Sequence, residues 1–156
     1  MKTKFQIGIL ALILAVTCDG CFLMPAPRSA YRPIHQYAKA GDAAAVAADL
    51  ATNHCDLNLP DDGGLTPLHL AASHCHTNVM ALLLDKGASV NKKGQGGATA
   101  LHLAAQEGCV DGVTLLLARK AKINGRDDAG RTPLTRAEQW HQAAVAQLLR
   151  EHGGKE

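Results

Sequence analysis

The chain has 156 residues, which is enough for one compact domain or for a short repeat array behind a leader. Hydrophobic residues make up 47% of the sequence but aromatic residues only 3%, so the apolar side chains suit closely packed helices. Without Lys2 and Lys4 the 16 basic residues fall to 14, equal to the 14 acidic residues, and this balance argues against nucleic-acid binding.

Residues 1–17 have the pattern of a signal peptide. Lys2 and Lys4 precede an unbroken apolar run over residues 7–16, which would span about 15 Å as a helix. That length is roughly half of the hydrocarbon core of a membrane, and Asp19 ends the run, so a cleaved leader is favoured over an uncleaved anchor. The sequence therefore predicts an exported protein.

The residues after the leader leave the form of the mature N-terminus open. Residues 14–18 resemble a bacterial lipobox, in which Cys18 would be lipidated, although Ala15 and Thr17 depart from that pattern. We therefore expect either an inner-membrane lipoprotein or a soluble exported protein. The resemblance implies the periplasm or cell envelope of a bacterium, with membrane contact only through the leader or a lipid on Cys18. Residues 18–30 are expected to form a linker.

From residue 31 onward the chain repeats with a step of 33 residues. Thr66, Thr99 and Thr132 occupy the same place in three aligned segments, which read GLTPLHLAA, GATALHLAA and GRTPLTRAE. Each threonine is suited to cap a helix whose Leu and Ala residues form a narrow apolar face. A second apolar pattern with helical spacing follows, as at residues 79–83. Each repeat therefore predicts two helices that bury one side against neighbouring repeats.

The 33-residue step and the TPLHLAA segment resemble the ankyrin repeat over residues 31–154. The resemblance implies an all-α solenoid of stacked helix-turn-helix units with short hairpin loops, in which His69 and His102 are structural residues that link neighbouring loops. It also implies a monomer that binds another protein, with no catalytic residue and no cofactor. The units are expected at residues 31–63, 64–96, 97–129 and 130–154, with caps at both ends.

The alignment makes two predictions about the terminal units. Ile34 lies 34 positions before Leu68, so the first unit has one extra residue, which we place in its inter-helix turn. In the last unit Arg136 and Glu138 replace the Leu and Ala of the preceding units. We expect both side chains to face water and to form a C-terminal cap.

Histidine and cysteine residues gather in the predicted inter-helix turns. His74, Cys75 and His76 lie in one turn, and Cys109 lies one residue out of step in the next. The four side chains are compatible with a metal site, with a Cys75–Cys109 disulfide in an oxidising compartment, or with ordinary turn residues. A small metal- or redox-handling protein is therefore the alternative to a protein-binding function.

Positions that stacking does not fix are the candidates for binding a partner. They are the loop residues Asp61, Asp62, Lys92, Lys93, Gln95, Arg126, Asp127 and Asp128, and the helix residues Gln106, Glu107 and Trp140. The paired carboxylates are expected to be solvated, which argues against catalysis. The charges predict a partner with an acidic patch facing Lys92 and Lys93. Trp140 is either a contact anchor or packed against the C-terminal cap.

Overall fold

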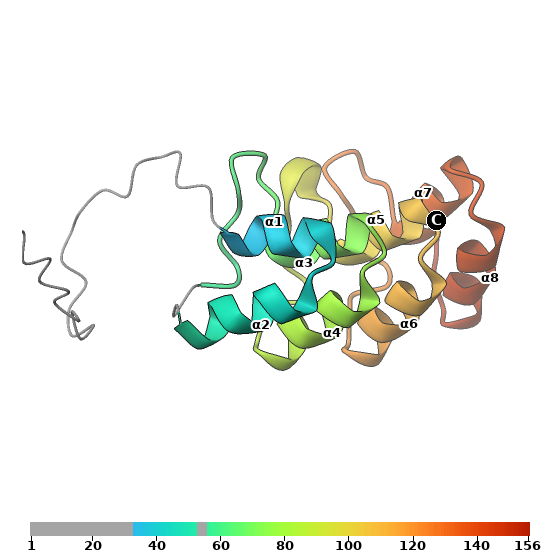
Figure 1. Cartoon of the computed structure of the whole chain (residues 1–156). Helices are drawn as coiled ribbons and strands as arrows, with labels where there is room; N and C mark the ends of the chain where they lie inside the picture. Colours follow the sequence, from blue (N-terminus) through green and yellow to red (C-terminus); the bar gives the residue numbers. More distant parts are fainter. Residues whose placement is uncertain (1–32, 53–55) are drawn as a thin grey trace, which may run out of the picture.

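The computed structural model describes residues 33–52 and 56–156 (Figure 1). In this part of the chain the backbone forms eight α-helices, one short 3-10 helix and no strand. The predicted leader and linker, together with Cys18, lie outside the described residues. No helix within the described ranges is long and apolar enough to cross a membrane.

The helices pair into units that stack in a row. The first helices of the units are α1 (Pro33–Ala40), α3 (Pro67–Ser73), α5 (Ala100–Glu107) and α7 (Pro133–Gln139). The second helices are α2 (Ala43–Thr52), α4 (Thr77–Asp85), α6 (Val110–Ala118) and α8 (Ala143–Glu151), and the 3-10 helix η1 (Gln95–Gly97) precedes α5. The two sets form two layers (Figure 1), and within each layer successive helices are in contact. The all-α repeat solenoid expected from the sequence is confirmed.

The predicted threonine and histidine positions build the start of each first helix. The Thr66 amide donates to Nδ1 of His69 at 3.2 Å, and Nε2 of the same ring donates to the Ala98 carbonyl of the next unit at 3.0 Å. Thr99 and His102 repeat this arrangement toward Arg131. Burial lowers the pKa of His69 and of His102, which agrees with a neutral ring that accepts at Nδ1. The predicted structural role of both histidines is confirmed.

The core lies between the two helix layers and between successive units. Its largest side chains are Ile34, Met80 and five leucines, all at most 1% exposed: Leu68, Leu83, Leu101, Leu116 and Leu149. Ala71, Ala104 and Ala137 are fully buried on the first helices. Their small side chains let α3, α5 and α7 pack closely, which explains how a sequence with so few aromatic residues fills its core.

The extra residue of the first unit does not lie where the alignment placed it. The starts of α1 and α3 are 34 positions apart, and so are the starts of α2 and α4. Leu57 is again 33 positions before Val90, so the insertion falls after the start of α2 and before Leu57. Helix α2 has ten residues where α4 has nine. The inter-helix turn is not lengthened, because Gly41 has the same place between its two helices, and the same φ of +77°, as Gly108 in the third unit.

Candidate protein-binding surface

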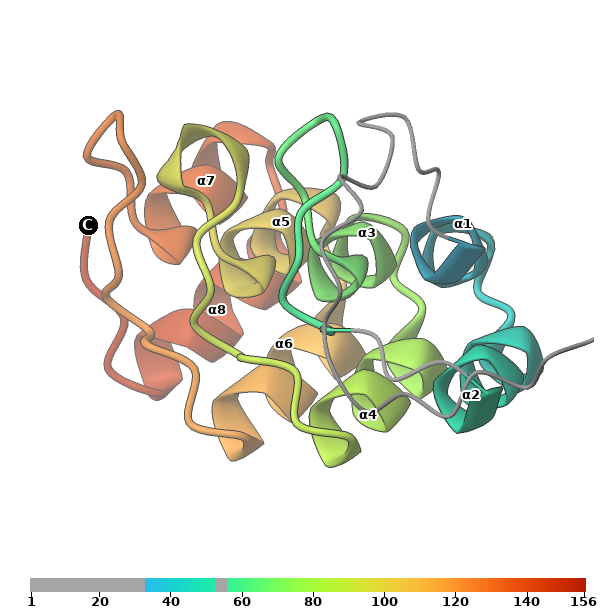
Figure 2. The ribbon, with the colours of Figure 1, turned by 90° about the vertical axis from the view of Figure 1, so that its left-hand side faces the viewer.

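The loops between units form a continuous row along one side of the array (Figure 2). A ladder of asparagine side chains links them, in which Oδ1 of Asn58, Asn91 and Asn124 accepts from the backbone amides of Ser89, Lys122 and Lys155 at 2.7–2.8 Å. The Asp128 amide also donates to the Gly96 carbonyl at 3.0 Å. Each loop is thereby fixed to the next, and the row presents its exposed side chains from a pre-ordered backbone.

Two of the predicted contact residues hold the loops together instead of facing a partner. Oδ1 of Asp61 accepts from the amides of Gly63 and Leu65 at 2.9 and 2.8 Å. Asp127 makes the same contacts one loop further along, at 2.9 Å each with the amides of Ala129 and Arg131. Such bonds close a tight loop, so both aspartates are explained by the local backbone.

Asp127 is not solvated, and the prediction that it lies free at a loop tip is wrong. It is 4% exposed, and its Oδ2 accepts from Nη2 of Arg136 at 2.8 Å and from Nε of Arg131 at 3.0 Å. Burial alone would raise the pKa of Asp127, but the hydrogen bonds from Arg136 and Arg131 outweigh it and lower this pKa to about 2. The carboxylate is therefore charged and paired at any physiological pH.

The prediction that Arg136 faces water is wrong for the same reason. Its side chain is 9% exposed beneath the last loop, and its Nη1 also donates to Oε1 of Gln106 at 3.1 Å. Gln106 is therefore engaged within the array. The sequence carried a signal for this pairing, because Arg136 stands where Leu70 and Leu103 stand in the units before it. A cation at a position buried by stacking needs a carboxylate partner.

The other predicted contact residues are exposed. They are Asp62, Lys92, Lys93, Gln95, Arg126 and Asp128 in the loops, and Glu107 and Trp140 at the ends of α5 and α7. Lys93 and Arg126 also donate to backbone carbonyls, Lys93 to Arg126 and Arg126 to Gly130 and Glu156. Trp140 is 57% exposed, so it is not buried against the C-terminal cap.

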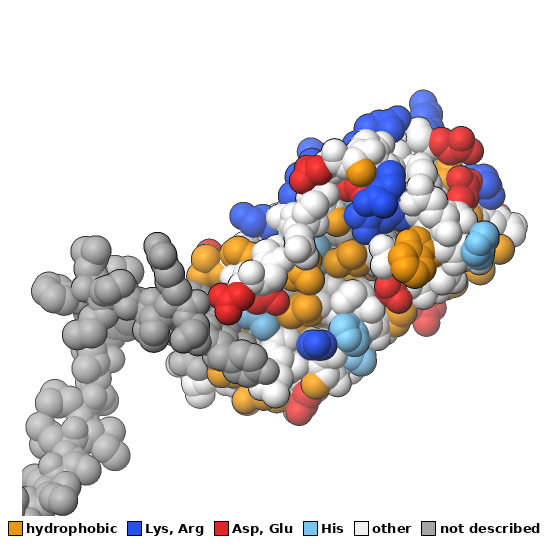
Figure 3. Space-filling model, turned by 90° about the horizontal axis from the view of Figure 1, so that it is seen from above, with side chains coloured by type: hydrophobic (Ala, Val, Ile, Leu, Met, Phe, Trp, Pro, Cys, Tyr) orange, Lys and Arg blue, Asp and Glu red, His pale blue; other side chains and the backbone are white. Residues whose placement is uncertain are grey.

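Charge is distributed unevenly along this surface. Residues 56–65, in the first loop, include Asp56, Asp61 and Asp62 but no Lys or Arg. The later loops carry the exposed Lys92, Lys93 and Arg126. On the face seen from above, Lys and Arg side chains gather toward the C-terminal end of the array, where Asp and Glu side chains also lie (Figure 3). The exposed charges of the first loop are therefore acidic, those of the second are basic, and the third carries both signs at Arg126 and Asp128.

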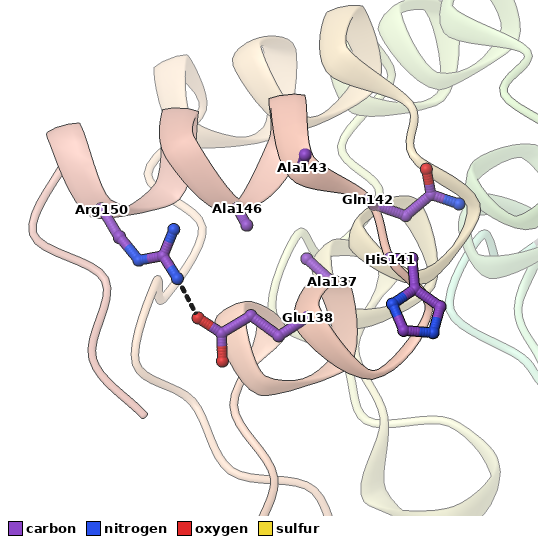
Figure 4. Close-up of a pocket in the computed structure, with 7 residues that line it drawn as sticks. All are labelled: Ala137, Glu138, His141, Gln142, Ala143, Ala146 and Arg150. Atoms are coloured by element: carbon purple, nitrogen blue, oxygen red, sulfur yellow. Dashed lines mark hydrogen bonds and ion pairs between the residues drawn. The ribbon is translucent and has the colours of Figure 1, made fainter.

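The end face of the last unit is polar where inner units are apolar. Glu138 and Arg150 stand at the positions of Ala105 and Leu117 in the preceding unit, and they form an ion pair across the face (Figure 4). They border a shallow hollow of about 330 Å³ between α7 and α8. The predicted polar character of Glu138 as part of the cap agrees with this geometry.

The histidine and cysteine cluster forms a disulfide. Cys75 and Cys109 are bonded, with their Cα atoms 5.4 Å apart. Nδ1 of His74 lies 3.1 Å from the Leu70 carbonyl, and Nε2 of His76 lies 3.1 Å from the Lys39 carbonyl. Among residues 33–52 and 56–156, no group of three or more His, Cys, Asp or Glu side chains is arranged to hold a metal ion. Of the three alternatives, this geometry favours the disulfide.

Stacked helix pairs with ordered loops define a repeat scaffold, and comparison with known proteins agrees. The family model described as ankyrin repeats (3 copies) matches residues 34–127 and 95–156. The chain therefore belongs to the ankyrin-repeat family. Ankyrin repeats are generally protein–protein interaction modules, and the fold is typically non-catalytic.

Three relatives share short stretches of the sequence. Palmitoyltransferase akr1 of Neurospora crassa is 40% identical over 68 residues, 44% of this chain and 9% of that protein. A probable serine/threonine-protein kinase of Dictyostelium discoideum is 49% identical over 41 residues, 26% of this chain and 5% of that protein. E3 ubiquitin-protein ligase XBAT32 of Arabidopsis thaliana is 48% identical over 44 residues, 28% of this chain and 9% of that protein. The chain spans less than a tenth of each relative, and all three organisms are eukaryotes.

Proposed function

We propose that the array binds one partner protein through a loop-row surface. This surface consists of the exposed residues Asp62, Lys92, Lys93, Gln95, Glu107, Arg126, Asp128 and Trp140. Asp61, Gln106 and Asp127 are left out of it because they are half-buried or buried and their side chains bind other parts of the array. The observation that carries the proposal is the ordered loop row, since its hydrogen bonds fix the backbone before a partner arrives.

The chemistry of the surface indicates the chemistry of the partner. Lys92 and Lys93 are exposed on the second loop and would face an acidic patch. Asp62 on the preceding loop would face a basic group. Trp140 is a suitable anchor, because an indole ring buries a large area while losing few rotamers.

We propose further that the protein acts after export, in the periplasm or cell envelope of a bacterium. The resemblance of residues 14–18 to a lipobox supports a bacterial envelope, and two observations support export. Residues 1–17 have the pattern of a signal peptide. The Cys75–Cys109 disulfide is of the kind that persists in oxidising compartments and is rare in the cytosol. Both forms of the mature N-terminus, with or without lipid on Cys18, are compatible with this proposal, and the mass of the mature N-terminal peptide distinguishes them.

A charge-reversal pair tests the binding proposal. The Lys92→Glu/Lys93→Glu variant is compared with Lys86→Glu/Lys120→Glu, which makes the same change of charge at exposed positions outside the surface. Both variants and the wild-type protein are used to capture partners from cell-envelope extract. We expect the first variant to lose a partner that the wild type and the control retain, with all three folded at the temperature of the assay. Equal capture by all three would contradict the proposed surface.

A further inference from the structure

At each interface between neighbouring units, one residue of the earlier inter-helix turn contacts one residue of the later turn, and the two positions are the same each time. At the first interface the ring of His76 lies over Gly41, where an added Cβ would come within 2.6 Å of Nδ1. At the third interface Gln142 lies over Gly108, where an added Cβ would also clash. In both pairs the residue of the earlier turn is a glycine with φ +77°, so its missing side chain makes room for the later residue.

The central interface uses the same two positions differently. Cys75 takes the place of the glycine and keeps a left-handed conformation, φ +57°, which is unfavourable for a residue with a Cβ. Cys109 takes the place of His76 and Gln142. Instead of a side chain lying over a glycine, the two side chains are joined by a covalent bond. The disulfide therefore replaces the non-covalent turn contact at the middle of the array.

The two cysteine residues differ in their exposure to solvent. Cys75 is exposed, whereas Cys109 is 5% exposed. Cys109 is also the residue that precedes the nine-residue helix α6, and a helix N-terminus stabilises a thiolate. We propose that this disulfide is a reducible link between the second and third units, which a small thiol or a dithiol protein opens by attack on Sγ of Cys75.

The exchange balances in two steps. A thiolate forms a bond to Sγ of Cys75 while the Cys75–Cys109 bond breaks, and the electron pair leaves on Sγ of Cys109, which then takes a proton from solvent. A second thiolate attacks the added sulfur of this mixed disulfide and releases the Cys75 thiolate, which is protonated in turn. Two external thiols are oxidised to one disulfide, and the protein disulfide is reduced to two thiols. Attack of Cys109 on the mixed disulfide reverses the first step.

Reducing the disulfide weakens the array at its central interface. The bond joins the second unit to the third, so two units lie on either side of it. A repeat array needs at least about three stacked units for stability, so neither two-unit half would stay folded if the central interface separated. The reduced protein should therefore unfold at a lower urea concentration, by about 1–2 M, and over a broader range than the oxidised protein.

The site of attack is tested on the full chain with Cys18, Cys21 and Cys55 replaced by Ser. The folded protein is treated briefly with reduced glutathione, quenched with acid, alkylated and analysed by peptide mass spectrometry. We expect glutathione on Cys75 and the alkyl group on Cys109. Glutathione mainly on Cys109, or no exchange in the folded protein, would overturn the proposal.

A matched variant separates the covalent bond from the packing around it. Cys75→Gly/Cys109→Gln copies the Gly108 and Gln142 pair of the next interface. We expect its urea midpoint to be unaffected by dithiothreitol, while that of the parent chain falls. The comparison of oxidised and reduced parent chain stands without this variant, and equal midpoints for those two forms would also overturn the proposal. None of these measurements depends on a binding partner.

Discussion

Replacing Asp127 by Asn tests the buried ion pair beneath the last loop. The change keeps a side-chain oxygen for the loop amides of Ala129 and Arg131 but removes the charge that faces Arg136. The pKa of Asp127 falls from 3.8 to about 2 on folding, which corresponds to about 2 kcal/mol of stability at neutral pH. Arg136 would remain buried opposite Gln106 alone, and breaking a buried pair in this way costs about 3–5 kcal/mol. We expect a loss of about 2–4 kcal/mol.

The assay is urea unfolding followed by far-ultraviolet circular dichroism at pH 7. Asp61→Asn is the matched control, because Asp61 makes the same loop contacts without forming an ion pair, and it should cost less than about 1 kcal/mol. In Asp127→Asn/Arg136→Leu the arginine is replaced by the residue found at positions 70 and 103, so most of the loss should be recovered. A similar small loss for both single Asn variants, or no recovery in the double variant, would refute the reasoning.

The contribution of Asp127 also has a defined pH dependence. Folding lowers the pKa of this carboxyl, so the stabilisation is fully present above pH 3.8 and is lost as the pH falls toward 2. The Asp127→Asn variant lacks this term. The difference in unfolding free energy between wild type and variant should therefore shrink on acidification within that window, and a difference that stays constant down to pH 2 would contradict the assigned pair.

Two further predictions concern stability. Burial lowers the pKa of His69 and His102, so the stability that each neutral ring contributes is present above pH 6.5 and is lost as the pH falls below it. In urea titrations, a His69→Gln/His102→Gln variant should therefore have a flatter profile of stability against pH between pH 7 and 5. Lys120 has φ +63°, and the equivalent residues of the second and fourth units are glycines. Lys120→Gly should therefore stabilise the protein by about 1 kcal/mol in the same assay. A loss of stability would show that the backbone of Lys120 is not strained.

The sequence was sufficient to predict the repeating part of the fold. The 33-residue step and the capping position of Thr66 and Thr99 were enough to place the helices, because each signal recurs in register and depends only on local chemistry. The position of the inserted residue was predicted wrongly, since a match between α1 and α3 does not distinguish an insertion in the turn from one beyond the start of α2. The match of Leu57 with Val90 was already visible in the sequence and shows that the insertion lies before Leu57. Only the start of α2, which the structure supplies, excludes the turn as its position.

The binding surface was predicted only in part, and the missed contacts are tertiary. Asp127 and Arg136 are nine residues apart in the sequence, and their pairing depends on how the loop folds over α7. Asp62 and Asp127 are equally acidic loop residues in the sequence, yet one is exposed and the other is buried. The one-residue stagger between Cys75 and Cys109 left their pairing open, because it depends on the left-handed backbone of the earlier turn.

We expect the loop-row surface, and not the layer of second helices α2, α4, α6 and α8, to meet the partner. A photo-crosslinking amino acid placed at Gln95, on the second loop, tests it against the same amino acid at Gln147, an exposed residue of α8. Both replace a glutamine, so the two proteins differ only in the place of the probe. We predict a crosslinked product of defined mass from position 95 and none from position 147. A product from position 147 alone would contradict the account.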